Sequence, residues 1–282
     1  MHGMLDQSKS DQIVLHDITQ HIGYNLLGPI FHFWLLALHQ YIQYFDDGHT
    51  AFLLCARAGV RIKKLYQIFL RGFPTNTMTK TFWISRLSVA KGLSRNDPAN
   101  AIKLIAREYH DCSLRQLIEG LLRNHSSRLS SLDLSRKDLD AHGFKFQDWL
   151  IKNGPVQKAL RNYLNECANA FDTYVGKLIE DKSRAVLIDS GWKGTVQSLL
   201  THSYPDVEWK GLYFGRILTM HHDPTIVQDV IGLMFESEVY DPDVSESAFA
   251  RHRHIVEALL EPNGPSIEEI PAHPFTEIAD VI

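Results

Sequence analysis

The sequence predicts an α/β fold, a mostly parallel sheet with flanking helices. Short apolar runs alternate along the chain with longer segments whose apolar residues recur at helical spacing. Several of these runs pass through a small-residue turn directly into a helical segment, as a strand does before its crossover helix. The order strand, helix, strand, helix favours a parallel sheet, and we expect residues 1–282 to form a single α/β domain.

Turn and cap signals place the elements. Pro29 suits the first turn of a long helix, because its fixed φ and missing N–H fit that position. Asp46-Asp47-Gly48 is typical of a turn into a first strand. The expected elements are helix 12–21, helix 29–45, strand 51–57, helix 60–71, strand 80–84, strand 184–189, helix 194–202, strand 207–215, strand 227–235 and helix 248–260.

The middle of the chain differs in character from its two flanks. Between the second and third expected strands the apolar residues keep helical spacing, which predicts a helical insertion or subdomain over residues 98–180. A Ser- and Asp-rich piece at 126–140 is expected to be an exposed connection. The proline-rich segment after Pro262 is expected to be irregular.

Composition bounds the class of protein. The chain of 282 residues is 44% hydrophobic and 22% charged, which is ordinary for a globular protein with a full core. A net charge of −4, with no basic run, argues against general nucleic-acid binding. The three cysteines form no C-x-x-C pair, and the simplest interpretation is a reduced, cytoplasmic chain.

Membrane association is expected to be peripheral at most. The N-terminus lacks the signal-peptide pattern of a basic, an apolar and a small-residue region. The most apolar window, 26–41, contains two histidines and a Gly28-Pro29 break, and it falls short of the roughly 20 apolar residues that a spanning helix needs. This window is typical of a buried or interface helix, so any contact with the membrane would be at its inner face.

The most informative segment runs from Ala185 to Gln197. An apolar strand ends in Asp189, the turn Ser190-Gly191-Trp192-Lys193-Gly194 follows, and Thr195 opens a helix. Backbone N–H groups of such a turn and the helix N-terminus can hold an anion. The segment matches neither the Walker nor the dinucleotide fingerprint. The purely structural alternative is that Asp189 caps the helix and the glycines shape the turn.

Two further strand ends carry arginines. Arg57 follows the apolar run 51–56 and precedes Ala58-Gly59 and a helical segment, and Arg86 follows strand 80–84. Because carboxyl ends of parallel strands meet at one sheet edge, we expect Arg57, Arg86 and Asp189 to converge. Two guanidiniums suit phosphate, and a carboxylate suits sugar hydroxyls or a metal. Each arginine taken alone is better interpreted as a surface or ion-pair residue.

The histidines do not favour a metal site. The candidates are His221-His222-Asp223 and the pair His252 and His254. Adjacent histidines point in different directions on a regular element, and the sequence contains no H-E-x-x-H. A phosphate-bearing substrate therefore remains the stronger hypothesis.

Several segments together resemble a known family. They are Gly23–Pro29, Ala56–Gly59, Ser85-Arg86, Ile188–Gln197, Gly211–Gly215 and Glu257–Gly264. In this order they resemble a domain of bacterial polysaccharide-biosynthesis proteins often described as haloacid-dehalogenase-like. That domain is similar to phosphoribosyltransferases that use phosphoribosyl pyrophosphate (PRPP) to build ribofuranose-containing glycans. The resemblance spans roughly residues 23 to 264 and depends on the order of the segments.

The resemblance implies a type I phosphoribosyltransferase-like core and a role for each segment. Asp189 would engage the ribose hydroxyls, and the turn from Gly191 to Thr195, with Thr195 as a hydroxyl donor, would hold the 5-phosphate. Ser190, Lys193 and Gly194 belong to the same substrate loop, and Lys193 suits the 5-phosphate. Trp192 would either shield the sugar from water or stack on an acceptor glycan, or it would serve in packing alone. Arg57, Ala58 and Gly59 would form the pyrophosphate loop, helped by Arg86 and Mg²⁺. Asp189 or Glu257 would serve as general base, although Glu257 can equally be a surface carboxylate. The acceptor would be a lipid-linked glycan, and a partner phosphatase would remove the 5-phosphate.

Two positions depart from the family pattern and keep alternatives open. Ser190 follows Asp189 where type I enzymes usually carry paired acids, and Ala58 stands where related glycan-synthesis sequences have Asp. One alternative is therefore a catalytically weakened phosphate- or glycan-binding module. The other is a haloacid-dehalogenase-type phosphatase with Asp189 as nucleophile, but such enzymes need a second acid where this chain has Gly191.

Overall fold

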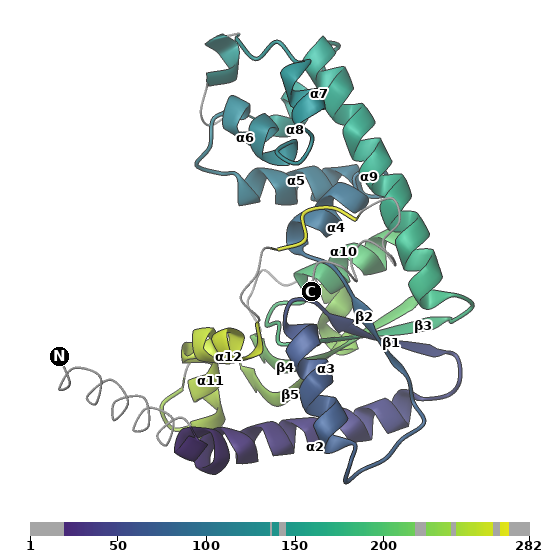
Figure 1. The fold of residues 1–282 in the computed structure, drawn as a ribbon, viewed down its shortest axis with the longest axis vertical. Coiled ribbons are helices and arrows are strands. Elements are labelled where there is room, and N and C mark those ends of the chain that lie inside the picture. Colours follow the sequence, from purple (N-terminus) through teal and green to yellow (C-terminus); the bar gives the residue numbers. More distant parts are fainter. Residues whose placement is uncertain are drawn as a thin grey trace, which may run out of the picture.

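A five-stranded, wholly parallel sheet forms the centre of the protein, so the α/β fold class predicted from the sequence is confirmed (Figure 1). The computed structural model describes residues 20–135, 137–140, 145–217, 224–237, 241–261 and 266–270. The strand order is β2-β1-β3-β4-β5. The strands are β1 (Thr50–Cys55), β2 (Thr79–Phe82), β3 (Arg184–Asp189), β4 (Glu208–Ile217) and β5 (Val230–Ser237).

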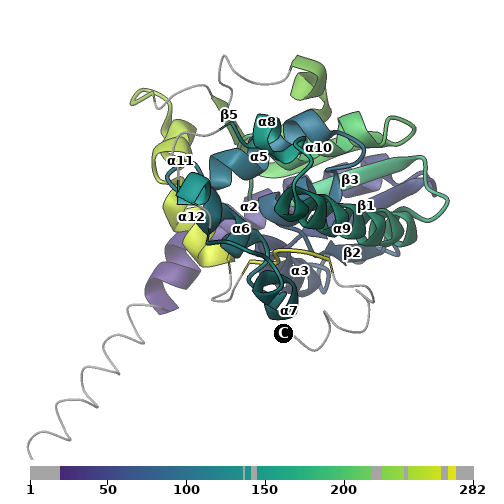
Figure 2. The ribbon, with the colours of Figure 1, turned by 90° about the horizontal axis from the view of Figure 1, so that it is seen from above.

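Helices cover both faces of the sheet (Figures 1 and 2). Those on one face are α2 (Gly28–Phe45, after the π-helical turn η1, Gly23–Leu27), α3 (Ala58–Phe69), α11 (Ala248–Arg251) and α12 (Arg253–Leu260). Those on the other face or beyond it are α4 (Arg86–Gly92), α5 (Pro98–Glu108), α6 (Leu114–Leu121), α7 (Ser126–Ser130), α8 (Phe146–Leu150), α9 (Pro155–Ile179) and α10 (Thr195–Ser203). Short 3₁₀ turns are η2 (Lys137–Asp140), η3 (Pro224–Asp229) and η4 (Ser245–Ser247).

The alternation of side chains explains why β1 is apolar along its whole length. Phe52 and Leu54 face the cluster that contains α2, α3 and α12, whereas Leu53 and Cys55 face the opposite cluster. A strand buried on both faces has no solvent side, so a continuous apolar run is what a central parallel strand requires. All six residues of β1 are buried.

The strand order creates a switch point between β1 and β3. From β1 the chain crosses over α3 to β2 on one side, and it returns past β1 through the helical insertion to reach β3 on the other side. The connection that leaves β1 runs through α3 to β2, and the connection that leaves β3 runs through α10 to β4 on the opposite side, so the two diverge at the carboxyl ends of β1 and β3. Open α/β sheets bind ligands at such a point.

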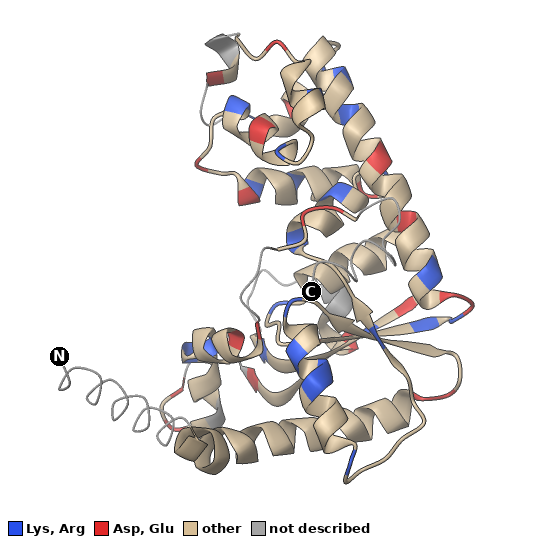
Figure 3. Ribbon diagram, viewed as in Figure 1, with Lys and Arg blue, Asp and Glu red and all other residues tan. Residues whose placement is uncertain are grey.

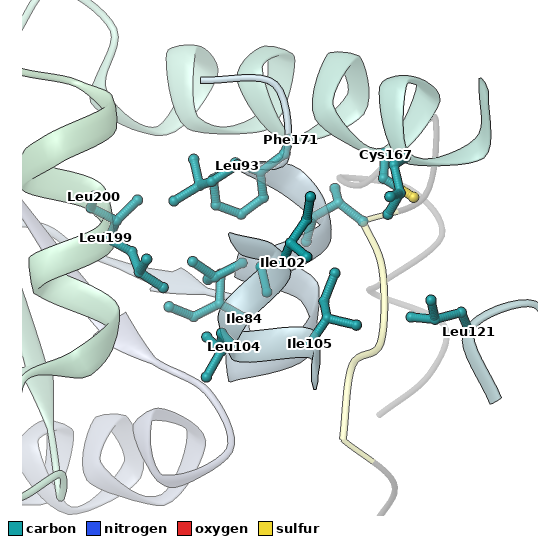
Figure 4. Packing of buried hydrophobic residues seen from close by; sticks show 14 of the residues in the cluster. Ile84, Leu93, Ile102, Leu104, Ile105, Leu121, Cys167, Phe171, Leu199 and Leu200 are labelled. Carbon is teal, nitrogen blue, oxygen red and sulfur yellow. The ribbon is translucent and has the colours of Figure 1, made fainter. Parts of the chain in front are cut away.

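The helical insertion shares its core with the sheet. Figure 4 shows Ile84, Leu93 and Phe171 packed towards Leu199 and Leu200 of α10, together with residues of α5 and α9. One buried cluster therefore runs from the face of the sheet opposite α2 and α3 into helices α4 to α9. The predicted helical character of residues 98–180 agrees with this, and α7 and η2 fall inside the 126–140 piece expected to be a plain connection.

Residues 266–270 form a strap that fastens the C-terminal part of the chain to the insertion (yellow in Figures 1 and 4). The Glu269 carboxylate accepts a hydrogen bond from the Tyr163 hydroxyl at 2.5 Å and lies 2.8 Å from His125 Nε2. The Ile267 carbonyl accepts a hydrogen bond from the Ser85 hydroxyl, and Glu268 pairs with Arg123. The sequence predicts an irregular segment here, and residues 266–270 form neither helix nor strand.

Helix α2 bears no Asp, Glu, Lys or Arg and packs on the sheet through Trp34, Leu35, Leu38 and Ile42 (Figure 3). Among the residues that the structure describes, no helix is both long enough and apolar enough to cross a membrane. The α2 segment is therefore a partly buried helix, which agrees with the buried or interface helix predicted for this window.

Element boundaries differ from the predictions at a few places. Ala58 and Gly59, expected in a turn, begin α3, and β2 ends at Phe82. The helix expected over 248–260 is interrupted at His252, which divides it into α11 and α12. The helix expected over 12–21 lies outside the described residues except for Gln20 and His21.

Gly59 permits the close approach of α3 to β1, and its replacement tests that contact. A Cβ at this position would lie 2.6 Å from the backbone carbon and oxygen of Leu54. Because backbone atoms cannot move aside locally, we expect Gly59→Ala to lower the free energy of unfolding by about 1–3 kcal/mol in urea titrations.

The matched control is Gly176→Ala in α9, where a Cβ would meet nothing within 4 Å. Here the gain in helix propensity predicts an unchanged or slightly higher stability, by up to about 1 kcal/mol. Equal effects of the two substitutions would show that α3 does not need this close approach.

Candidate functional site

The candidate site lies at the carboxyl ends of β1 and β3. These strands pair in parallel up to Leu54 and Ile188, so the residues that follow each strand emerge side by side. Beyond β1 the Ala56 N–H bonds to the Phe82 carbonyl of β2 at 2.9 Å, the Ala56–Arg57 peptide bond is cis, and Arg57 occupies the N-cap position of α3. Beyond β3 comes the segment Asp189–Thr195.

Asp189 is the last residue of β3 and is half-buried. Its Oδ1 accepts a hydrogen bond from the Ser190 N–H at 2.8 Å. Burial raises the pKa of Asp189 to about 7; the Ser190 and Gly191 N–H groups oppose that rise, and the charges of Glu261 and Glu257 add to it. Desolvation thus outweighs the hydrogen bonds, and the carboxyl group titrates near neutral pH.

The turn after Asp189 needs its two glycines. A Cβ on Gly191 would lie 2.9 Å from Asp189 Oδ2, and Gly194 has a φ of 65°, in the left-handed region that favours glycine. Ser190 is buried, Lys193 is exposed, and Thr195 is the first residue of α10. The backbone of this turn therefore lies close to the carboxylate and leads directly into a helix N-terminus.

Trp192 turns inward. Its ring packs on Phe214 and Phe235, with centroids 6.1 and 5.7 Å away, and its Nε1 donates a hydrogen bond to Glu257 Oε1 at 2.7 Å. The side chain is only 8% exposed. Trp192 therefore joins the Asp189 turn to α12, and a packing role accounts for these contacts.

Glu261, directly after α12, forms an ion pair with Arg57. The Arg57 side chain is 42% exposed and the Glu261 side chain 29%. Burial raises the pKa of Glu261, Arg57 lowers it, Glu257 raises it and Arg86 lowers it. Glu261 lies in the segment Glu257–Gly264 that contributes to the resemblance, but it was not among the predicted site residues, because it follows no strand end.

Arg86 lies farther out. It follows the N-cap Ser85 of α4, pairs with Glu108 at 3.4 Å, and is 60% exposed. Its charge nevertheless acts on Glu261, as do those of Arg57 and Glu257. We call Arg57, Asp189, Glu257 and Glu261 the β1–β3 site, with Arg86 at its edge.

Ala58 and Gly59 are in the site by position, but their surroundings are apolar. Ala58 is 3% exposed and belongs to the cluster that contains α2, α3 and α12. Gly59 lies against the backbone of β1. These two residues can offer backbone N–H groups at the start of α3, rather than a side chain.

The described residues contain no group of three or more His, Cys, Asp or Glu arranged to hold a metal ion. His252 and His254 have ring centroids 6.1 Å apart, and His221–Asp223 lie outside the described residues. Magnesium, however, usually needs only one or two carboxylates together with substrate phosphates. Asp189, at the end of β3, fits that requirement.

An apolar pocket of about 210 Å³ lies next to the site, between the start of α2 and helices α11 and α12. Its lining includes Phe31, Phe214, Phe249, Val256 and Leu259. Phe214 also packs on Trp192, so one aromatic layer separates the pocket from the Asp189 turn.

Comparison with protein-family models and with curated proteins finds no match for this chain.

Asp189→Asn tests the burial of this carboxyl group. A carboxyl whose folded-state pKa is raised contributes stability below its unfolded pKa, near 4, and loses it as pH rises towards about 7. The neutral amide of the variant does not ionise, so its free energy of unfolding does not fall in this way. The variant should therefore have a higher Tm than wild type at pH 8, by roughly 2–4 °C for each kcal/mol of difference in that free energy.

The difference in Tm should shrink between pH 8 and pH 5, as measured by thermal unfolding across that range. A constant difference would mean that Asp189 does not titrate with a raised pKa in the folded protein.

Proposed function

We propose that this protein transfers a 5-phosphoribosyl group from PRPP to a sugar hydroxyl of a growing bacterial surface glycan. One observation carries the proposal: Arg57 and Asp189 follow adjacent parallel strands at the switch point of the sheet. A guanidinium suits a diphosphate, and a carboxylate suits the hydroxyls of the pentose between the two phosphates.

The turn from Ser190 to Thr195 would receive the 5-phosphate. Its glycines keep the backbone close to Asp189, and Thr195 opens α10, whose N-terminal N–H groups favour an anion. Lys193 is exposed and can approach a phosphate oxygen. This assignment follows the resemblance to the PRPP loop of type I phosphoribosyltransferases.

The opposite end of the donor would lie on the β1 side. Arg57 and the N–H groups of Ala58 and Gly59 would hold the pyrophosphate, with Arg86 adding positive charge from the edge. Magnesium, held by Asp189 together with phosphate oxygens, would neutralise charge on the leaving group. Arg57 stabilises the same charge as it develops, which is where fixed cations accelerate displacement most.

The proposal includes partners and a location. The acceptor is a lipid-linked glycan, and a phosphatase, as a further domain or a separate protein, removes the 5-phosphate afterwards. Nucleic acid is not among the partners. The chain would work in the cytoplasm, at the inner face of the membrane where such acceptors are assembled.

A phosphatase of the haloacid-dehalogenase type is disfavoured by the turn itself. Such an enzyme needs a second acid two positions after its nucleophile, and the Cβ of any side chain at Gly191 would lie 2.9 Å from Asp189 Oδ2. A binding module without turnover is the second candidate. It is favoured by the apolar surroundings of Ala58, where related sequences carry Asp.

The decisive assay is incubation of the full chain with PRPP, Mg²⁺ and a lipid-linked or synthetic glycan acceptor, with mass detection of an added phosphopentose. We expect transfer by the wild type and a loss of at least about 100-fold in Asp189→Ala, because the ribose loses its anchor. Asp206→Ala, at an exposed carboxylate beyond α10, is the matched control and should retain full activity.

Three other outcomes would contradict the proposal. Phosphate release from simple phosphomonoesters, without PRPP consumption, would indicate a phosphatase. Affinity for PRPP with no transfer would indicate a binding module. Equal activity of wild type and Asp189→Ala would place the chemistry elsewhere.

A further inference from the structure

The end of α12 is fixed above the β1–β3 site by two contacts that do not involve Glu261. Arg61 of α3 donates hydrogen bonds from Nη1 to the carbonyl oxygens of Leu259 at 2.7 Å and Ala258 at 3.3 Å. Glu257 accepts the hydrogen bond from Trp192. The helix is therefore tied both to α3 and to the Asp189 turn, and the next residue, Glu261, is placed against Arg57.

The three carboxylates of the site are not equivalent. Asp189 accepts a backbone hydrogen bond within its own turn, and Glu257 is engaged by an indole N–H. Glu261 is paired with Arg57, the same side chain that suits the pyrophosphate of the donor. Of the three, only Glu261 would change its partner when a doubly charged group binds Arg57.

We propose that Glu261 occupies the pyrophosphate subsite on Arg57 in the free protein, is displaced when the donor binds, and then takes the proton from the acceptor hydroxyl. This inference deepens the proposed function and rests on it for the identity of the donor. It assigns the general base to Glu261 in place of Asp189 or Glu257.

Partner exchange explains why the base is active only when the donor is present. A diphosphate offers Arg57 several charged oxygens and bidentate geometry, which a single carboxylate in water-exposed surroundings does not match. Once Arg57 is taken, Glu261 loses the cation that lowers its pKa, while burial and Glu257 continue to raise it. A carboxylate with a higher pKa is a stronger base.

The reaction balances in one displacement. The acceptor oxygen forms a bond to C1 of the ribose as its proton passes to the Glu261 carboxylate. The bond from C1 to the pyrophosphate oxygen breaks, and pyrophosphate leaves with the electron pair. The neutral carboxyl group then releases its proton to water, and the return of Glu261 to Arg57 favours departure of the pyrophosphate.

The test compares Glu261→Gln with wild type in two measurements. Calorimetric titration with PRPP and Mg²⁺, without acceptor, should give a Kd about threefold to fivefold lower in the variant, because the competing ion pair is weakened. Single-turnover transfer should fall by about 100-fold or more, and the rate should lose its dependence on pH on the acidic side.

The matched control is Glu166→Gln, which removes an exposed carboxylate of α9 that is paired with Arg128 of α7 in the insertion. It should change neither the Kd nor the rate. Circular dichroism and Tm of both variants confirm that each is folded.

The outcomes separate this inference from the proposed function. Transfer by wild type with an unchanged Kd or an unchanged rate in Glu261→Gln overturns the inference and leaves the function intact. If wild type neither binds nor transfers PRPP, the proposed function fails. Titration of both proteins with inorganic pyrophosphate and Mg²⁺ then tests whether Glu261 competes with pyrophosphate for Arg57. Equal affinities of wild type and Glu261→Gln for pyrophosphate would overturn the inference that Glu261 occupies this subsite.

Discussion

The pairing of β1 with β3 is the constraint on which the rest depends. Both strands are apolar on their two faces, so they can be buried only at the centre of a parallel sheet with helices above and below. That position forces their crossovers apart and brings Arg57 and Asp189 to neighbouring strand ends. The apolar contacts that stabilise the fold therefore also position the two charged side chains of the candidate site.

The site is held together at a cost to stability. Asp189 sits among groups that favour its neutral form, and two further carboxylates, Glu257 and Glu261, lie within range of its charge. The indole of Trp192 and the guanidinium of Arg57 each satisfy one of those two. Ligand-binding regions commonly carry such unfavourable charge, and Mg²⁺ or the hydroxyls of a bound pentose would relieve it.

Strand ends could be predicted from the sequence, whereas contacts through α12 and the strap could not. Asp189 and Arg57 each stand at the end of an apolar run, and parallel strands share their carboxyl edge, so the sequence predicted that they emerge from neighbouring strand ends. Arg86, expected to converge with them, pairs with Glu108 at the edge of the site. Glu261 reaches Arg57 only because Arg61 and Trp192 dock α12, contacts that join residues far apart in the chain. Glu269 likewise contacts Tyr163 and His125 only through tertiary packing, which the spacing of residues in the sequence does not predict.

Hydrogen–deuterium exchange of the full chain, with and without PRPP and Mg²⁺, tests the central claim most directly. If the ligand binds at the ends of β1 and β3, exchange should slow in peptides that cover residues 56–60, 189–198 and 257–261, while α6 to α8 of the insertion stay unchanged. Protection confined to the insertion, or no protection at saturating PRPP, would contradict the assignment of this edge of the sheet as the donor site.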